Sequence, residues 1–290
     1  MIQEILINGA ATGGVFALLA VGFSLIFGVA RIINLAHTAF CMLAAYSVYA
    51  FSTIYGLNFY LSVVLAILLT VFVGSCAYRL CFHPIREHEL AVMVVSVALG
   101  IIIQQLMVLI FGGTFRSIPS FAAGYLELLG VRILKGHLLV LGIALFSLFL
   151  VWLMLTKTKL GIAIRATAQD REMASLVGIN VGWMCMITMA MAVALAALAG
   201  TMVGPLITLS PWMWLQLLVV VLAVVILGGL GSLKGSLLAA FLLGYTETAV
   251  VHFVPMGSFL RGVASLIVML IVLLVRPEGL FGISFEEERL

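Results

Sequence analysis

Charged residues are scarce in this sequence. Only 9% of its 290 residues are Asp, Glu, Lys or Arg, whereas 65% are hydrophobic. A soluble domain is typically about 25% charged and about 45–50% apolar. A chain of this size could not bury so much apolar surface in water, so lipid must be the solvent for most of it. The net charge of +3 is small and the basic residues are scattered along the chain, which disfavours a nucleic-acid partner.

The sequence also lacks the motifs of common catalytic sites. It has no G-x-x-x-x-G-K-[ST] loop, because its nearest stretch has Leu233 where a glycine must precede Lys234. It has no H-E-x-x-H motif and no Ser/His/Asp set that spacing would single out. The four cysteines have no metal-ligand spacing and are expected to be small packing residues. We therefore expect a chain that is not an enzyme and binds no ATP, metal or other cofactor itself.

Long apolar runs are abundant. A membrane span needs about 20 predominantly apolar residues, and only helices and closed barrels satisfy their backbone groups in hydrocarbon. Barrel strands alternate apolar and polar residues, whereas these runs are unbroken. Met1–Asn8 lacks the features of a cleaved signal peptide, so the first run is expected to stay in the mature protein. The sequence predicts helical segments at Ile5–Val29, Ile32–Thr53, Phe59–Leu80, Leu90–Phe111, His137–Leu155, Trp183–Val203, Trp212–Gly229, Leu233–Phe253 and Phe259–Val275.

Two joints between these segments are unusual. Only Ala30 and Arg31 separate the first two segments, and a glycine-rich stretch separates the seventh from the eighth. Each joint, 29–35 and 228–235, is either a tight turn at the surface or a helix break inside the membrane. The predicted fold is therefore all-α: a polytopic membrane protein of eight or nine transmembrane segments, with residues 1–290 forming a single domain.

The distribution of Lys and Arg indicates the orientation, because cytoplasmic loops retain these residues. The nine-segment count places Arg79, Arg86, Lys157, Lys159, Arg165, Arg171, Lys234, Arg276 and Arg289 on one side and Arg116, Arg132, Lys135 and Arg261 on the other. This moderate bias predicts a cytoplasmic C-terminus, and in the nine-segment count an N-terminus outside.

The longest loop on the predicted cytoplasmic side, 157–181, is amphipathic and rich in helix formers. Ile164, Ala168, Leu176 and Ile179 are its apolar positions, and Gly178 is placed to end a helix as a C-terminal cap. A short amphipathic helix in such a loop can lie on lipid headgroups, dock into a partner or serve as a solvated connector. The loop is not strongly basic, which disfavours the headgroup alternative.

Four motifs run in order along almost the whole chain. Gly22–His37 is similar to G-x-x-L-I-F-G-x-x-x-x-I-N-F-A-H-G, and Gly161–Val181 to G-x-A-x-R-A followed by A-x-x-x-x-x-A-x-x-x-G-I. Ile226–Gly235 is similar to V-L-G-G-x-G-S-x-x-G, and Val275–Gly282 to R-P-x-G-L-F-G. Together these motifs resemble the LivH-type permeases of branched-chain amino-acid ABC importers.

The resemblance implies a permease domain in a bacterial inner membrane that moves branched-chain or other hydrophobic amino acids from the periplasm to the cytoplasm. Its implied partners are a homologous, LivM-like permease, two ABC ATPase subunits that hold ATP and Mg²⁺, and a periplasmic substrate-binding protein. The loop 157–181 would then be the segment that couples to the ATPase. The matching coupling positions are Gly161, Arg165, Ala166, Ala168, Asp170, Glu172, Ala174 and Gly178. Asp170 is the only Asp of the chain, and ordinary solvation is the alternative to a partner contact.

Six polar residues inside apolar segments are candidates for the translocation pathway: Asn34, His37, Thr38, Gln104, Gln105 and Glu247. Broken helices in transporters expose backbone and polar groups to a cavity, which suits the joint before His37. Structural alternatives are that Asn34 caps the next helix, that His37 binds a neighbouring carbonyl, and that Glu247, favoured for this role, bonds another helix.

Glycines and departures from the family patterns complete the interpretation. Gly228, Gly229, Gly231 and Gly235 are expected to serve helix packing. Leu35 and Thr38 stand where the family usually has Phe and Gly, and Lys234 where it often has Pro, which weakens any inference about the substrate.

Three rival functions remain. The same machinery could carry urea, short amides or aromatic acids. An ion-coupled secondary transporter would use Glu247 and His252 as proton carriers. An intramembrane enzyme would need a water-accessible catalytic pair, which the sequence does not provide.

Overall fold

In the described part of the chain, each predicted segment contains a helix, although the segment Ile32–Thr53 becomes helical only at His37. The computed structural model describes residues 2–86, 88–118, 124–128, 131–204 and 208–281. Arg289 and Gly282, which the sequence analysis used, lie outside these residues. The helices are α1 (Ile2–Ala30), α2 (His37–Tyr49), α3 (Phe59–Ala77), α4 (Glu89–Phe111), α5 (Lys135–Lys157), α6 (Lys159–Gln169), α7 (Arg171–Leu176), α8 (Val181–Val203), α9 (Met213–Gly228), α10 (Leu233–Phe253) and α11 (Arg261–Val275).

The lengths of these helices divide the nine segments into two groups. Among the described residues, six helices are long and apolar enough to cross a membrane, and they are α1, α3, α4, α5, α8 and α10. The helices α9 and α11 are apolar but shorter. The thirteen residues of α2 continue into a π-helical turn at Ala50–Ile54. Polar side chains begin five of the described helices, because each accepts a backbone N–H of the first turn: Asn58, Thr158, Asp170, Asn180 and Ser232.

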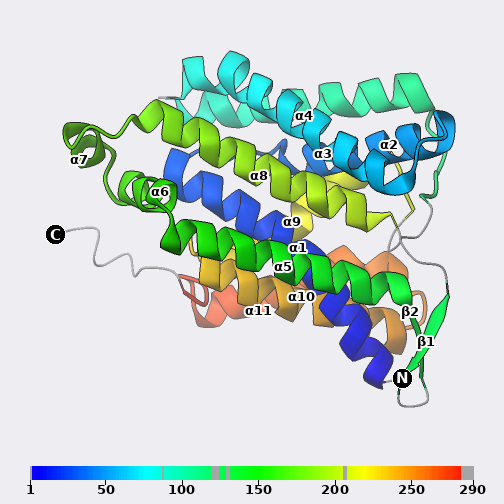
Figure 1. The fold of residues 1–290 in the computed structure, drawn as a ribbon. Coiled ribbons are helices and arrows are strands. Elements are labelled where there is room, and N and C mark those ends of the chain that lie inside the picture. The colour runs from blue at the N-terminus through cyan, green and yellow to red at the C-terminus, as the bar shows by residue number, and fades with distance from the viewer. Residues whose placement is uncertain (1, 87, 119–123, 129–130, 205–207, 282–290) are drawn as a thin grey trace.

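The helices run between two opposite ends of the bundle (Figure 1). One end, called here the α7 end, holds α6, α7 and the last residues of α1 and α11. The other, called the hairpin end, holds the start of α1 and an antiparallel pair of short strands, β1 (Tyr125–Leu128) and β2 (Val131–Leu134). Among the described residues, this hairpin and an isolated β-bridge between Arg116 and Leu209 depart from the all-α prediction. Because α1 begins at one end and α11 finishes at the other, an odd number of crossings fits the arrangement.

Helix α1 forms the centre of the bundle. It packs against α5, α8, α9 and α10, and 89% of its central span is buried inside the protein. Small residues allow the closest approach: a side chain at Gly244 of α10 would meet the backbone of Gly13 of α1. The exposed surfaces of α3, α4, α5 and α11 carry large apolar side chains, as expected of helices that face lipid.

The first joint combines both alternatives that the sequence left open. Helix α1 ends at Ala30, and Arg31 is exposed with a positive φ of 47°. Residues 31–34 are not helical, and the chain turns back into the bundle before α2 begins at His37. The His37 ring binds the carbonyl of Leu19, eleven residues before the end of α1 and therefore about 16 Å from it. Helix α2 thus begins near the middle of a hydrocarbon core about 30 Å thick.

The second joint is a turn at the α7 end. Gly229 and Gly231 have positive φ values of 94° and 82°, so they serve the turn itself. Gly228 and Gly235 bring the backbones of α9 and α10 into contact, as the packing prediction requires. The segment after α11 covers this turn: Leu280 and Phe281 donate their N–H groups to the carbonyls of Leu227 and Gly228, at 2.8 and 3.2 Å. The third and fourth sequence motifs, which contain Gly228 and Leu280 respectively, therefore contact each other.

Candidate coupling and translocation site

The re-entrant residues after α1 are held by bonds within this chain. Asn34, His37 and Thr38 are completely buried. The side-chain oxygen of Asn34 accepts the N–H of Ala36 at 3.1 Å, and its Nδ2 lies 3.9 Å from the sulfur of Met189. His37 Nε2 lies 3.1 Å from the Leu19 carbonyl. The His37 contact matches its structural alternative, a bond to a neighbouring carbonyl. Asn34 does not cap α2, because it accepts the N–H of Ala36 before the helix and α2 has no side-chain cap. A contact of either residue with substrate stays a prediction.

Two helices that begin inside the bundle meet at Thr38. The Thr38 hydroxyl donates a hydrogen bond of 2.9 Å to the carbonyl of Trp214, in the first turn of α9. The indole N–H of Trp214 in turn donates to Oε1 of Gln104 on α4, at 2.6 Å. The structure therefore joins Thr38 and Gln104 through Trp214, whereas Gln105 is exposed on the outer side of α4. Sequence reasoning missed Trp214, because an aromatic residue in an apolar run gives no local sign of such a role.

Glu247 belongs to a different contact. Its side chain is 4% exposed and accepts a hydrogen bond of 2.7 Å from the hydroxyl of Ser265, which joins α10 to α11. His252 Nδ1 lies 2.9 Å from the Thr248 carbonyl of its own helix. The interhelical bond is the alternative that the sequence analysis favoured for Glu247.

The coupling segment consists of two short helices with well-defined ends. The hydroxyl of Thr158 accepts the N–H of Gly161 at the start of α6, and Gly161 packs directly on the backbone at the end of α5. The Asp170 carboxylate accepts the N–H groups of Glu172 and Met173 at 2.9 and 3.0 Å, so it caps the start of α7.

Gly178 ends α7 in the predicted way. Its φ is 86°, and it donates its N–H to the Ser175 carbonyl while Ile179 donates to the Ala174 carbonyl. This pair of bonds is the Schellman motif, which favours glycine at the left-handed position. The predicted C-terminal cap is therefore confirmed.

The coupling positions divide between the surface and the interior. Arg165, Asp170, Glu172 and Gly178 are exposed, Ala166 and Ala168 are half-buried, and Gly161 and Ala174 are buried. The buried pair packs the segment onto the bundle instead of facing a partner. The most exposed apolar side chains of α7 and its end are Met173, Leu176 and Val177, at 62%, 79% and 76%. We call these three residues the α7 tip; their i, i+3, i+4 spacing was the sequence signal that could have identified them.

Arg171 connects the coupling segment to the end of α1. Its Nε and Nη2 donate hydrogen bonds of 3.2 and 2.9 Å to the carbonyl of Val29. Val29 is the next-to-last residue of α1, where carbonyl groups have no partner in the helix and attract positive charge. Arg171 therefore grips α1 just before the residues that re-enter the bundle.

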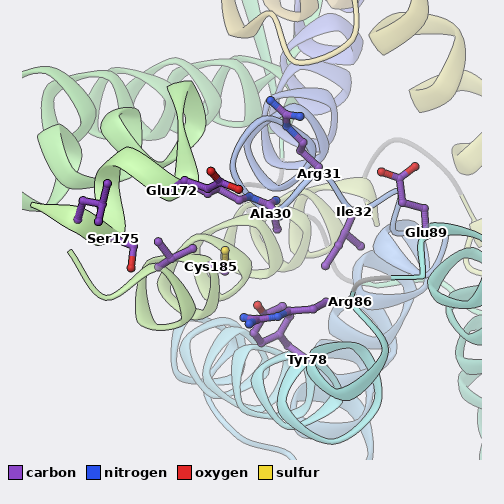
Figure 2. A pocket seen from close by; sticks show the side chains of 12 residues that line it. Ala30, Arg31, Ile32, Tyr78, Arg86, Glu89, Glu172, Ser175 and Cys185 are labelled. Carbon is purple, nitrogen blue, oxygen red and sulfur yellow. The ribbon is translucent and has the colours of Figure 1, made fainter. Parts of the chain in front are cut away.

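A cleft of about 740 Å³ opens beside this contact (Figure 2). The end of α1 and α7 form one wall, with Ala30, Arg31 and Glu172. The residues after α3 and the start of α8 form the other, with Tyr78, Arg86 and Cys185. The cleft separates α7 from the residues after α3 and from the start of α4, so these elements do not reinforce the contact between Arg171 and α1.

Comparison with known proteins places this architecture in a family. Residues 5–275 match the family model described as branched-chain amino acid transport system / permease component. The permease protein BraD of the high-affinity branched-chain amino acid transport system of Pseudomonas aeruginosa is 27% identical over 96% of this chain and 94% of its own length. The LivH permease protein of Escherichia coli is 25% identical over 95% of this chain and 94% of its own.

A solved structure supports the fold alone. The chain resembles one in the structure described as PsaBC from Streptococcus pneumoniae in complex with Fab, with a TM-score of 0.53 and 16% identity over 95% of this chain and 93% of that one. The family match covers nearly the whole chain, and its helices are those of a multi-pass membrane protein. The chain therefore belongs to the family of permease components of branched-chain amino acid transport systems.

Proposed function

We propose that this chain is a permease subunit of a bacterial ABC importer that carries branched-chain or other hydrophobic amino acids from the periplasm to the cytoplasm. ATP with Mg²⁺ would be bound by two partner ATPase subunits, and this chain would bind no cofactor. A homologous second permease would complete the pathway, and a periplasmic binding protein would deliver the substrate. The family match and the names of the relatives support the substrate class.

The bond between Arg171 and Val29 is the observation that carries this proposal. The α7 tip offers an apolar surface to an ATPase, while Arg171 on the same helix holds the end of α1. A helix that a motor grips can pass rigid-body motion to the packed helices attached to it. Movement of α7 would therefore pull on α1 immediately before the re-entrant residues and α2.

The proposed orientation puts the α7 end in the cytoplasm of an inner-membrane protein. In the described chain, Arg31, Arg79, Arg86, Lys157, Lys159, Arg165, Arg171, Lys234 and Arg276 lie at this end, and Arg116, Arg132, Lys135 and Arg261 lie at the hairpin end. Cytoplasmic loops retain Lys and Arg, so the excess supports an inner-membrane protein with a cytoplasmic C-terminus.

Purification of the tagged chain from native membranes, with mass spectrometry of the proteins that accompany it, tests the proposal. We expect a second permease and P-loop ATPases, and we expect the ATPases to be lost from the Leu176→Glu variant of the α7 tip. The matched control is Phe115→Glu, because Phe115 is 74% exposed at the hairpin end. Recovery of the chain alone, with solute transport driven by an ion gradient, would contradict the ABC assignment.

The substrate is tested separately by uptake into proteoliposomes that contain the purified complex and internal ATP. We expect labelled leucine, isoleucine and valine to accumulate only with the binding protein present. Accumulation of urea, short amides or aromatic acids instead would support the ABC importer assignment and contradict the proposed amino-acid substrate.

A further inference from the structure

Helix α9 presents a polar group where a membrane helix should face lipid. Trp212, Leu215 and Val219 are exposed at 47%, 46% and 40%, and Gln216 lies exposed among them. We call these four residues the α9 stripe. Among the residues that the structure describes, the Gln216 amide is given no hydrogen-bond partner.

The depth of Gln216 follows from its neighbours. Trp214, two residues earlier, accepts the Thr38 hydroxyl, and the adjacent His37 ring binds Leu19 in the middle of α1. In the other direction, Gln216 lies twelve residues before Gly228, which is about 18 Å at the rise of an α-helix. Gly228 ends α9 at the α7 end, so Gln216 lies near the middle of the hydrocarbon layer.

Such a position is unfavourable for an amide in contact with lipid. The hydrocarbon core offers no hydrogen-bond partner, so polar side chains at this depth face protein or a water-filled cavity. Gln105 on α4 is also an exposed amide without a hydrogen-bond partner among the described residues, whereas hydroxyl groups on exposed helices show the contrasting pattern. Ser147 and Thr246, for example, satisfy their hydroxyls on carbonyl groups of their own helices.

The location of the α9 stripe also fits a pathway. Helices α2 and α9 both begin inside the bundle and meet at the bond between Thr38 and Trp214. Broken helices that meet at mid-membrane are the usual setting of a transport pathway. In Figure 1, α9 lies behind α1, on the opposite side of the bundle from α5. The α9 stripe is therefore on a different face of the bundle from the exposed, lipid-facing side chains of α5.

We propose that the α9 stripe lines a water-filled substrate path that the second permease subunit closes from the other side. Gln216 supplies the polar contact at the middle of this path, and Leu215 and Val219 supply its apolar wall. This inference rests on the proposed function, because it needs the second permease. It adds a residue, Gln216, to the pathway.

Cysteine accessibility in the assembled complex tests this proposal. The four native cysteines are replaced by alanine, and Gln216→Cys and Leu215→Cys are then introduced one at a time. The matched control is Leu145→Cys on α5, because Leu145 is 47% exposed, like Leu215 at 46%, and also lies in the middle of its helix. The probe is a membrane-impermeant trimethylammonium thiosulfonate, applied from each side of the membrane.

We expect modification of the Gln216→Cys and Leu215→Cys variants and a several-fold fall in transport after the reaction, with the control unmodified. Equal modification of all three variants, or of none, would overturn the water-filled path. A second variant, Gln216→Leu, should reduce transport several-fold without lowering the yield of the complex. If Gln216→Leu instead transports normally and raises thermal stability, the residue faces lipid. Modification at 215 and 216 in a complex that carries none of the expected amino acids would contradict the substrate and leave the path standing.

Discussion

Arg171 binds the carbonyl of Val29 through two nitrogen atoms, at 3.2 and 2.9 Å, and so joins α7 to the last turn of α1. The two residues are 142 positions apart in the sequence. Val29 lies five residues before the buried Asn34. In the proposed coupling, a displacement of α7 would reach the re-entrant residues through this contact, without passing through the rest of the bundle.

The first prediction concerns this contact. Arg171→Ala should weaken the joint by about 1.5–3 kcal/mol, the usual contribution of a hydrogen bond to a charged group. We expect several-fold less transport per ATP hydrolysed in proteoliposomes, with the ATPase subunits still bound. The Arg171→Lys variant should transport an amount per ATP that lies between those of the unchanged protein and the Arg171→Ala variant. An ammonium group keeps the charge but cannot reproduce the two-nitrogen geometry of a guanidinium.

Arg79→Ala is the matched control for Arg171→Ala. Arg79 is exposed at the same end of the bundle, and the structure gives it no hydrogen bond to another described residue. The same loss of coupling in both variants would show that positive charge at this end matters, and not the contact with Val29.

The second prediction separates the two roles of Asp170. As the cap of α7, it accepts two backbone N–H groups, and asparagine can accept them as well. Asp170→Ala should destabilise α7 by about 0.5–2 kcal/mol and reduce the recovery of ATPase with the purified permease. Asp170→Asn should restore that recovery. If Asp170→Asn binds the ATPase as poorly as Asp170→Ala, the negative charge itself contacts the partner.

The third prediction assigns Glu247 to stability. Ser265→Ala removes the hydroxyl that donates to the buried Glu247 carboxyl group and should lower the free energy of unfolding by about 1–3 kcal/mol, the cost of an unsatisfied buried acceptor. The control is Ser147→Ala, because the Ser147 hydroxyl binds only a carbonyl of its own helix. This substitution should change the free energy of unfolding by less than about 0.5 kcal/mol. Glu247→Gln should keep ATP-driven transport. Loss of transport in Glu247→Gln, at normal complex yield, would return Glu247 to the pathway.

The nine segments were predictable because apolarity is a local property of the sequence. The run 32–53 shows the limit of that signal. Its first residues are as apolar as a helix, yet residues 31–34 are not helical and α2 begins only at His37. The bond between His37 and Leu19 holds the chain there, and no local pattern encodes a contact with the preceding helix.

The candidate site was predictable only in part, for the same reason. The caps formed by Asp170 and Gly178 follow from residues close in sequence, and the sequence located Gly178 correctly. The contact of Arg171 with Val29 and the bond between Trp214 and Gln104 join residues that are 142 and 110 positions apart. Gln216 was missed because one glutamine in an apolar run indicates neither its depth nor its exposure.

The fourth prediction measures the bond that joins α4 to α9. Trp214 is fully buried against Gly100, and its indole N–H donates to Gln104 at 2.6 Å. A double-mutant cycle of Trp214→Phe and Gln104→Leu should therefore give a coupling energy of about 1 kcal/mol in the unfolding of the purified complex. Trp152→Phe is the control, because Trp152 is 53% exposed on α5, and it should change stability by less than about 0.5 kcal/mol. Additive effects of the two substitutions would mean that the bond contributes nothing, and that packing against Gly100 and the bond from Thr38 position the start of α9.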